Sequence, residues 1–127
     1  MSSEKFDKGL AIRRRWLGEE YVNASLENAD DFTRPLQELV TENAWGSVWV
    51  RDGLPLKTRS MITVALLVAL NRPHELKLHL RAALRNGITR EELHEVLLHT
   101  HAYLGWPATV DAFRSAKEVL AETAKPR

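Results

Sequence analysis

The chain has 127 residues, with 18 lysine and arginine residues against 17 aspartate and glutamate residues and a formal net charge of +1. This length suits a single domain with its own hydrophobic core, and the near-neutral charge argues against a nucleic-acid-binding protein, which needs a strong positive field. The chain has no cysteine, which excludes disulfides, thiol redox catalysis and thiolate metal sites within it.

The remaining charge and hydropathy features also point away from nucleic acid and membranes. The densest basic run, Arg13-Arg14-Arg15, is followed by Glu19 and Glu20, so a solvated helix face explains it better than a DNA contact. We expect no secretory leader, and the most apolar stretch, 61–70, is half as long as the roughly 20 residues of a membrane span. We expect a cytoplasmic protein.

The spacing of apolar residues predicts helices and almost no strands. A first helix is expected over residues 4–17. A second begins near Thr33, with Pro35 in its first turn, where the missing N–H is tolerated. Residues 51–55, "RDGLP", have the composition of a turn.

Residues 58–71 are apolar on nearly every side, which predicts a central helix covered by other helices. The segment 61–70 is more apolar than so small a domain easily covers, so it also suggests a subunit interface. Both interpretations remain open at this point.

Three more helices are expected in the second half of the chain. One spans 74–86, and the next runs to about residue 104 from a capping box made by Thr89 and Glu92. The last spans roughly 108–122 and is expected to bury Val110, Phe113, Ala116 and Leu120. The sequence therefore predicts an all-α, single-domain bundle of about six helices over residues 1–127.

The helix over 74–86 carries an ionisable pair beside its predicted buried stripe. The stripe consists of Leu76, Leu80, Ala83 and Leu84. His79 falls on or beside it, and Glu75 lies one turn earlier. His79 is either a core histidine with both nitrogens satisfied or a functional group. Glu75 either orients the imidazole or pairs at the surface with Lys77 or Arg72.

Three further histidines invite a metal-site interpretation, which we reject. His94 and His101 are seven residues apart and share a helix face, whereas His99 is rotated away from both. The pattern of helical zinc proteases fails because residue 98 is leucine. No metal site is predicted.

The segments "TENAWGSVWVRDGL", "TRSMITVALLVAL" and "HELKLHLRAALRNGITREELHEVLLHTHAYLGWPA" resemble the carboxymuconolactone decarboxylase family over residues 30–122. The resemblance implies an alkylhydroperoxidase-like helical fold, preceded here by the helix over 4–17. It also implies a homo-oligomer, a trimer or a hexamer built from dimers.

The thiol-dependent branch of that family provides an instructive comparison. There, two cysteines precede a histidine by seven and four positions, and a glutamate lies twelve residues before the first cysteine. The matching positions here are Arg72, Glu75, His79 and Ser60. The histidine is retained and both thiols are missing, so peroxidase or disulfide-exchange chemistry has no nucleophile.

The decarboxylase branch implies conversion of 4-carboxymuconolactone to 3-oxoadipate enol-lactone in protocatechuate catabolism, the β-ketoadipate pathway, with neither metal nor organic cofactor. The partner is then a small dicarboxylate lactone. When one carboxylate leaves as carbon dioxide, its bonding electron pair is delocalised into the lactone carbonyl. The protein must supply a cation for the remaining carboxylate, a donor for the developing oxyanion and a positioned acid.

Three residues are candidates for the catalytic roles that this chemistry requires, and the resemblance favours a functional role for His79. His79 is the expected hydrogen-bond donor or proton-transfer group, and Glu75 orients its imidazole. Glu42 acts as a second acid or holds an arginine. Each assignment competes with an ordinary structural or surface role.

Five further residues are expected to bind the substrate. Arg51 and Arg59 flank a turn and would grip the retained carboxylate through paired hydrogen bonds, although arginines are usually solvated. Trp45 and Trp49, one helical turn apart, would wall the pocket, although aromatic residues at that spacing are more often core. Ser60 would donate to the lactone oxygen.

Two other functions remain open. A related lyase or isomerase acting on another small acid or lactone would need the same residue types. A non-catalytic helical assembly protein, with 61–70 as its packing surface, would bind no small acid.

Overall fold

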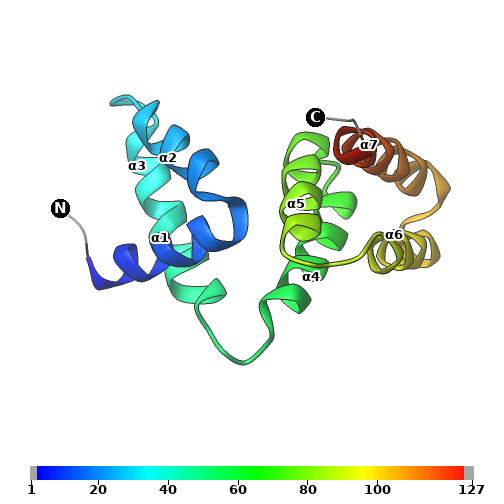
Figure 1. The fold of residues 1–127 in the computed structure, drawn as a ribbon, viewed down its shortest axis with the longest axis horizontal. Coiled ribbons are helices and arrows are strands. Elements are labelled where there is room, and N and C mark those ends of the chain that lie inside the picture. The colour runs from blue at the N-terminus through cyan, green and yellow to red at the C-terminus, as the bar shows by residue number, and fades with distance from the viewer. Residues whose placement is uncertain (1–2, 125–127) are drawn as a thin grey trace. The chain divides into compact units, whose positions relative to one another are not determined.

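The computed structural model describes residues 3–124, which form helices and no strand (Figure 1). The helices are α1 (Glu4–Leu17), α2 (Glu19–Glu27), α3 (Arg34–Leu39), the π-helical segment η1 (Val40–Trp49), α4 (Leu56–Ala69), α5 (Pro73–Arg85), α6 (Arg90–Leu104) and α7 (Trp106–Ala124). The all-α prediction is therefore confirmed. Contacts divide the chain into two compact units, Met1–Leu56 and Lys57–Arg127, which are described separately. The single-domain organisation stays a prediction.

In the first unit, α1 has the bounds that its apolar spacing predicts. The Ser3 side chain accepts a hydrogen bond from the backbone N–H of Phe6 at 3.0 Å and so caps the helix. The helix ends at Gly18, whose φ of 101° suits glycine. Its buried face packs against η1 and α2.

The helix that begins beside Thr33 also has its predicted start, with Pro35 in its first turn. It continues from α3 directly into η1, where hydrogen bonds span five residues instead of four. One runs from the backbone N–H of Val50 to the carbonyl of Trp45 at 3.2 Å. π-helical turns are rare in proteins, and the spacing of apolar residues does not predict this one.

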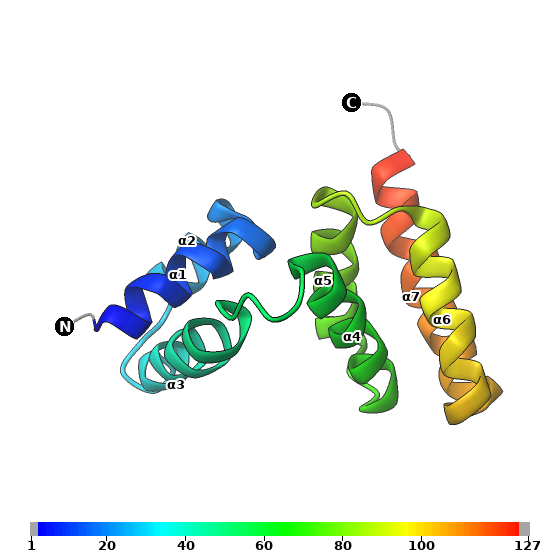
Figure 2. The same ribbon diagram turned by 90° about the horizontal axis from the view of Figure 1, so that it is seen from below.

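The second unit consists of four helices, and α7 packs against both α5 and α6. Helices α6 and α7 are joined at Gly105 and run antiparallel, side by side (Figure 2). The capping box is confirmed, because Thr89 and Glu92 exchange side-chain-to-backbone hydrogen bonds of 3.0 and 2.9 Å. The largest fully buried side chains of this unit include Leu80, Ile88 and Leu97.

Two predictions about this unit were wrong. Helix α7 begins at Trp106 instead of residue 108, because Pro107 lies in its first turn. Of the residues expected in its core, Ala116 is buried while Val110 and Phe113 remain partly accessible.

Residues 3–124 do not cover helix α4 on all sides. Its buried positions are Ser60, Val64 and Val68. Ile62, Leu66 and Leu70, spaced four residues apart, are exposed instead, Leu66 by 56%. The alternative interpretation, a subunit interface, therefore remains. No helix among residues 3–124 is long and apolar enough to cross a membrane.

Candidate active site

His79 lies on the buried face of α5. Pro73 occupies the first turn of this helix, and Leu76, Leu80 and Ala83 are buried beside the histidine, as their helical spacing predicts. His79 itself is 9% exposed. This burial lowers the pKa of His79 from 6.5 to about 4, because an imidazolium loses its hydration there. At neutral pH the ring is therefore uncharged, with one N–H donor and one acceptor nitrogen.

Two more predicted site residues belong to the same unit on α4. Ser60 is fully buried, and its neighbour Arg59 is half-buried. The carbonyl of Arg59 accepts a hydrogen bond from Thr63 Oγ1 at 2.8 Å. A fully buried hydroxyl and a half-buried guanidinium are thus adjacent in the chain, next to the boundary with the first unit.

Glu75 is exposed in the first turn of α5. In the interpretation of Glu75 as a surface residue, Lys77 was one of its two expected partners. Lys77 forms its ion pair with Glu118 of α7 instead. That part of the alternative is therefore wrong. The role of Glu75 toward His79 stays a prediction.

The first unit holds the other predicted site residues. Trp45 and Trp49 are buried on η1 with their rings stacked at 4.6 Å between centroids. Trp16 of α1 completes the cluster, 6.0 Å from Trp49. These three indoles form much of the core of this unit, whereas Arg51, just after η1, is exposed.

Glu42 lies in the first turn of η1 and is half-buried. Its backbone carbonyl accepts a hydrogen bond from Ser47 Oγ at 3.0 Å, which is part of the π-helical geometry. The preceding Thr41 is fully buried and donates to the carbonyl of Gln37 at 2.7 Å. The wider turns of η1 thus set the position of the Glu42 side chain.

A buried arginine beside Thr41 was missed by the sequence analysis. Arg13, which we expected on a solvated helix face with Arg14 and Arg15, is 5% exposed, and its Nη1 donates to Thr41 Oγ1 at 3.2 Å. The expectation was wrong because α1 places position 13 on the same face as Gly9 and Trp16, toward η1. The helical spacing of Gly9, Arg13 and Trp16 indicates that the three residues share one face of α1. The positive charge of Arg13 led us to expect solvent exposure instead.

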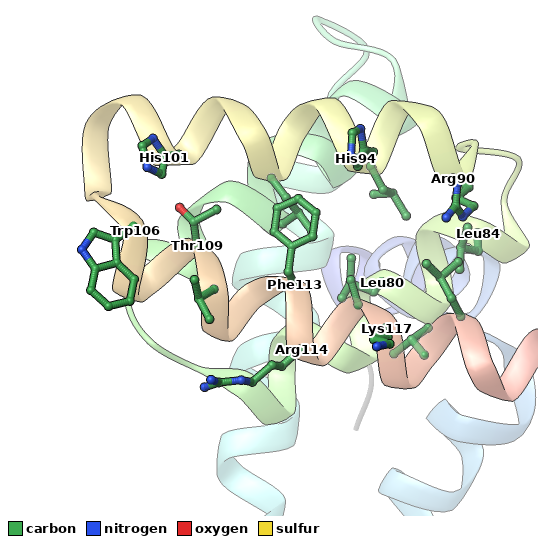
Figure 3. Close-up of a pocket in the computed structure, with 16 residues that line it drawn as sticks. Leu80, Leu84, Arg90, His94, His101, Trp106, Thr109, Phe113, Arg114 and Lys117 are labelled. Carbon is green, nitrogen blue, oxygen red and sulfur yellow. The ribbon is translucent and has the colours of Figure 1, made fainter.

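The second unit also contains a groove of about 660 Å³ between α6 and α7 (Figure 3). His94 and His101 both line it, as their shared helix face predicts, while His99 lines a separate surface beside α4. None of the eight predicted site residues lines the groove. Within residues 3–124, no three His, Asp or Glu side chains are placed to hold a metal ion.

The sequence places this chain among known proteins. The model of the carboxymuconolactone decarboxylase family matches residues 34–118. The chain is also 47% identical, over 91% of its length and 87% of the relative's, to the 4-carboxymuconolactone decarboxylase of Acinetobacter baylyi. The chain belongs to the carboxymuconolactone decarboxylase family. The matched region contains all eight predicted site residues and leaves out α1 and α2.

Two further relatives show how broad the carboxymuconolactone decarboxylase family is. A nitrosuccinic acid decarboxylase of Metarhizium robertsii is 48% identical over 84% of this chain and 75% of its own length. An uncharacterized 15.0 kDa protein of Paracoccus denitrificans is 32% identical over 79% of this chain and 80% of its own. Two relatives of almost equal similarity thus carry the names of decarboxylases that act on different acids.

Proposed function

We propose that this chain is a decarboxylase that converts 4-carboxymuconolactone to 3-oxoadipate enol-lactone and carbon dioxide without a cofactor, in the β-ketoadipate pathway. The observation that carries the proposal is its 47% identity, across nearly the whole chain, to a protein named for this activity. The retained His79 in a chain without cysteine supports it, since the thiol chemistry of related proteins has no nucleophile here.

The reaction breaks one carbon–carbon bond and makes one carbon–hydrogen bond. When the ring carboxylate leaves as carbon dioxide, its bonding electron pair stays on the ring carbon and spreads through the double bond to the lactone carbonyl oxygen. A proton then adds to ring carbon to give the enol-lactone. The carbonyl is itself the electron acceptor, so the enzyme has to stabilise a dienolate oxygen and deliver one proton.

His79 suits the first of these tasks. Its lowered pKa keeps the imidazole neutral at pH 7, so we assign it as an N–H donor to the dienolate oxygen. A buried donor that is already in place needs no reorganisation when the negative charge develops. A neutral imidazole is a weak acid, which favours a carboxylic acid, Glu42 or Glu75, as the source of the proton.

The other predicted residues are assigned to substrate binding. Arg51 and Arg59 carry the positive charge that the retained carboxylate requires. The buried hydroxyl of Ser60 is the proposed donor to the lactone ring oxygen, and Trp45 and Trp49 present flat apolar surface to the ring.

We further propose that the protein works as a homo-oligomer, a trimer or a hexamer, in the cytoplasm. The exposed stripe formed by Ile62 and Leu66 of α4 and by Leu70, which directly follows the helix, supports an interface on this surface. From Ser60 to Leu70 the chain has no charged residue. An uncharged apolar face of this kind is typical of surfaces that another subunit covers.

The 48% identity to a nitrosuccinic acid decarboxylase favours a second candidate, a decarboxylase acting on that or another small acid. The two reactions are chemically alike, because a nitro group accepts the electron pair as a conjugated lactone does. Purified protein should be given each acid separately while carbon dioxide release is followed. Faster turnover of the lactone supports the first candidate, and faster turnover of nitrosuccinate supports the second.

The same experiment separates catalysis from a purely structural role. A non-catalytic assembly protein accelerates neither reaction and gains no thermal stability from dicarboxylates or lactones. Activity that survives dialysis against EDTA supports the cofactor-independent mechanism. Activity that is lost on dialysis and restored by a divalent metal ion contradicts it.

A further inference from the structure

The groove between α6 and α7 has the size and lining of a ligand site. Its volume of about 660 Å³ lies in the range of small-molecule sites, roughly 300–1,000 Å³. Leu93, Leu97 and Val119 are buried and line it, with Leu80 contributed by α5. Phe113 points into its middle from α7 (Figure 3). The groove therefore offers a continuous apolar surface that solvent reaches.

The charged side chains that line this groove all carry positive charge. They are Arg90, Arg114 and Lys117, and neither aspartate nor glutamate is present among the 16 lining residues. The whole chain has nearly equal numbers of basic and acidic residues, so the lining departs from the average composition. A groove lined in this way favours anions over cations.

Two of the three acidic residues of α7 form ion pairs with α5. Glu118 pairs with Lys77 of α5. Glu122 holds Arg81 of α5 through two hydrogen bonds of 2.9 and 3.0 Å. These two carboxylates therefore tie α7 to α5 instead of neutralising the groove.

Two of the three cations remain available to a ligand. Arg114 is bound to Asp111 at 2.9 Å. Within residues 3–124, neither Arg90 nor Lys117 takes part in an ion pair. Figure 3 shows Arg90 on α6 and Lys117 on α7, both on the side of Phe113 that faces away from Trp106. The groove thus has an apolar middle and a cationic end.

We propose that this groove binds an amphipathic organic anion, a free carboxylic acid with an aliphatic or aryl chain. The chain lies over Phe113 and Val110, and the carboxylate lies between Arg90 and Lys117. This ligand is distinct from the proposed substrate, because none of the residues assigned to decarboxylation lines the groove.

The oligomer interface proposed above lies on α4, and no residue of α4 lines the groove. A helix from a second copy is the competing occupant, but an uncharged apolar surface would serve that purpose and the cationic end would have no function.

Trp106 provides a reporter for the test. It lines the groove and is 67% exposed, whereas the other three tryptophans, Trp16, Trp45 and Trp49, belong to the first unit. The intact protein should be titrated with decanoate, hexanoate and decyltrimethylammonium below their micelle concentrations. Tryptophan fluorescence and calorimetry are recorded together. We expect decanoate to bind at least tenfold more tightly than hexanoate, because each buried methylene contributes roughly fourfold. The cation should bind more weakly than decanoate.

Substitutions locate the site. Arg90→Gln and Lys117→Gln should each weaken decanoate binding by roughly two- to fivefold, as expected for exposed charge pairs. Lys5→Gln, which removes an exposed lysine from the first unit, is the matched control and should leave the affinity unchanged. Trp106→Phe should abolish the change in tryptophan fluorescence on decanoate binding, while the affinity measured by calorimetry should stay the same.

Three binding results would each overturn the proposal. They are no decanoate binding, equal binding of the decyl cation, and full affinity in the Arg90→Gln, Lys117→Gln double variant. Light scattering during the titration addresses the competing occupant. A fall in molar mass as decanoate binds would show that a second copy fills the groove, and it would also overturn the proposal.

Discussion

Gly9 of α1 and Gly46 of η1 lie against each other with no room for a side chain between them. A Cβ atom added to Gly9 would be 2.7 Å from the backbone nitrogen of Gly46 and 2.0 Å from the carbonyl oxygen of Thr41. A Cβ atom added to Gly46 would be 2.2 Å from the carbonyl oxygen of Lys5. Helices α1 and η1 therefore cross backbone to backbone.

This crossing predicts that Gly9→Ala and Gly46→Ala each destabilise the protein by about 1–3 kcal/mol or more, because backbone atoms cannot move aside as side chains do. Gly53→Ala is the matched control, since a Cβ atom there meets nothing within 4 Å. Denaturant unfolding measures the difference. If Gly9→Ala and Gly46→Ala have the same unfolding free energy as Gly53→Ala, α1 and η1 do not cross as closely as described.

The buried His79 makes stability depend on pH. Its pKa is 6.5 when unfolded and about 4 when folded, so the unfolded chain binds the proton more readily between these values. The stabilisation is complete above pH 6.5 and is lost as the pH falls toward 4. At about 1.4 kcal/mol per pKa unit, the loss is at most about 3 kcal/mol.

His79→Gln should therefore flatten the fall in unfolding free energy between pH 7 and 4, compared with wild type. His74→Gln is the control, because His74 lies exposed on the same helix. Unfolding curves at a series of pH values provide the measurement. Parallel curves for wild type and His79→Gln would contradict the burial of this imidazole.

The capping box at the start of α6 predicts a moderate effect. Thr89→Ala removes the acceptor of the 3.0 Å hydrogen bond from the Glu92 backbone N–H and should cost about 1 kcal/mol of unfolding free energy. Thr89→Ser keeps the hydroxyl and should retain most of the stability. If both variants lose the same unfolding free energy, the hydroxyl of residue 89 contributes nothing to stability.

Much of this structure follows from local sequence signals. The start of α1, the proline in the first turn of α3 and the Thr89–Glu92 box are each encoded within a few residues, and the structure confirms them. The burial of His79 follows equally from the 3.6-residue period of α5. Such features need no knowledge of distant parts of the chain.

Other features depend on contacts that periodicity does not encode. Helix α2 was missed because only nine residues separate Gly18 from Asn28, and no side chain caps its start. The burial of Arg13 arises from its position facing Thr41, 28 residues further along the chain. Trp16 joins Trp49 only because α1 crosses η1. For the candidate site, the sequence indicates which residue types are suited to the chemistry. Which of these side chains are buried depends on the fold.

The exposed stripe of α4 leads to a prediction about assembly. Leu66→Glu places a charge in the middle of the uncharged face and should lower the molar mass measured by light scattering, since burying an unpaired carboxylate is costly. Leu36→Glu on α3 is the matched control, because Leu36 is similarly exposed in the first unit. An unchanged mass for Leu66→Glu, or dissociation caused by Leu36→Glu, would contradict an interface on α4.

The most direct test of the central claim is the rate of carbon dioxide release from 4-carboxymuconolactone by wild type, His79→Gln and His74→Gln, with folding checked for each. We expect rapid release by wild type and His74→Gln. For folded His79→Gln we expect kcat to fall by about 10²–10⁴-fold, the usual contribution of a positioned acid–base or donor group. Wild-type protein that does not accelerate the reaction, or folded His79→Gln that retains full activity, would contradict the proposed mechanism.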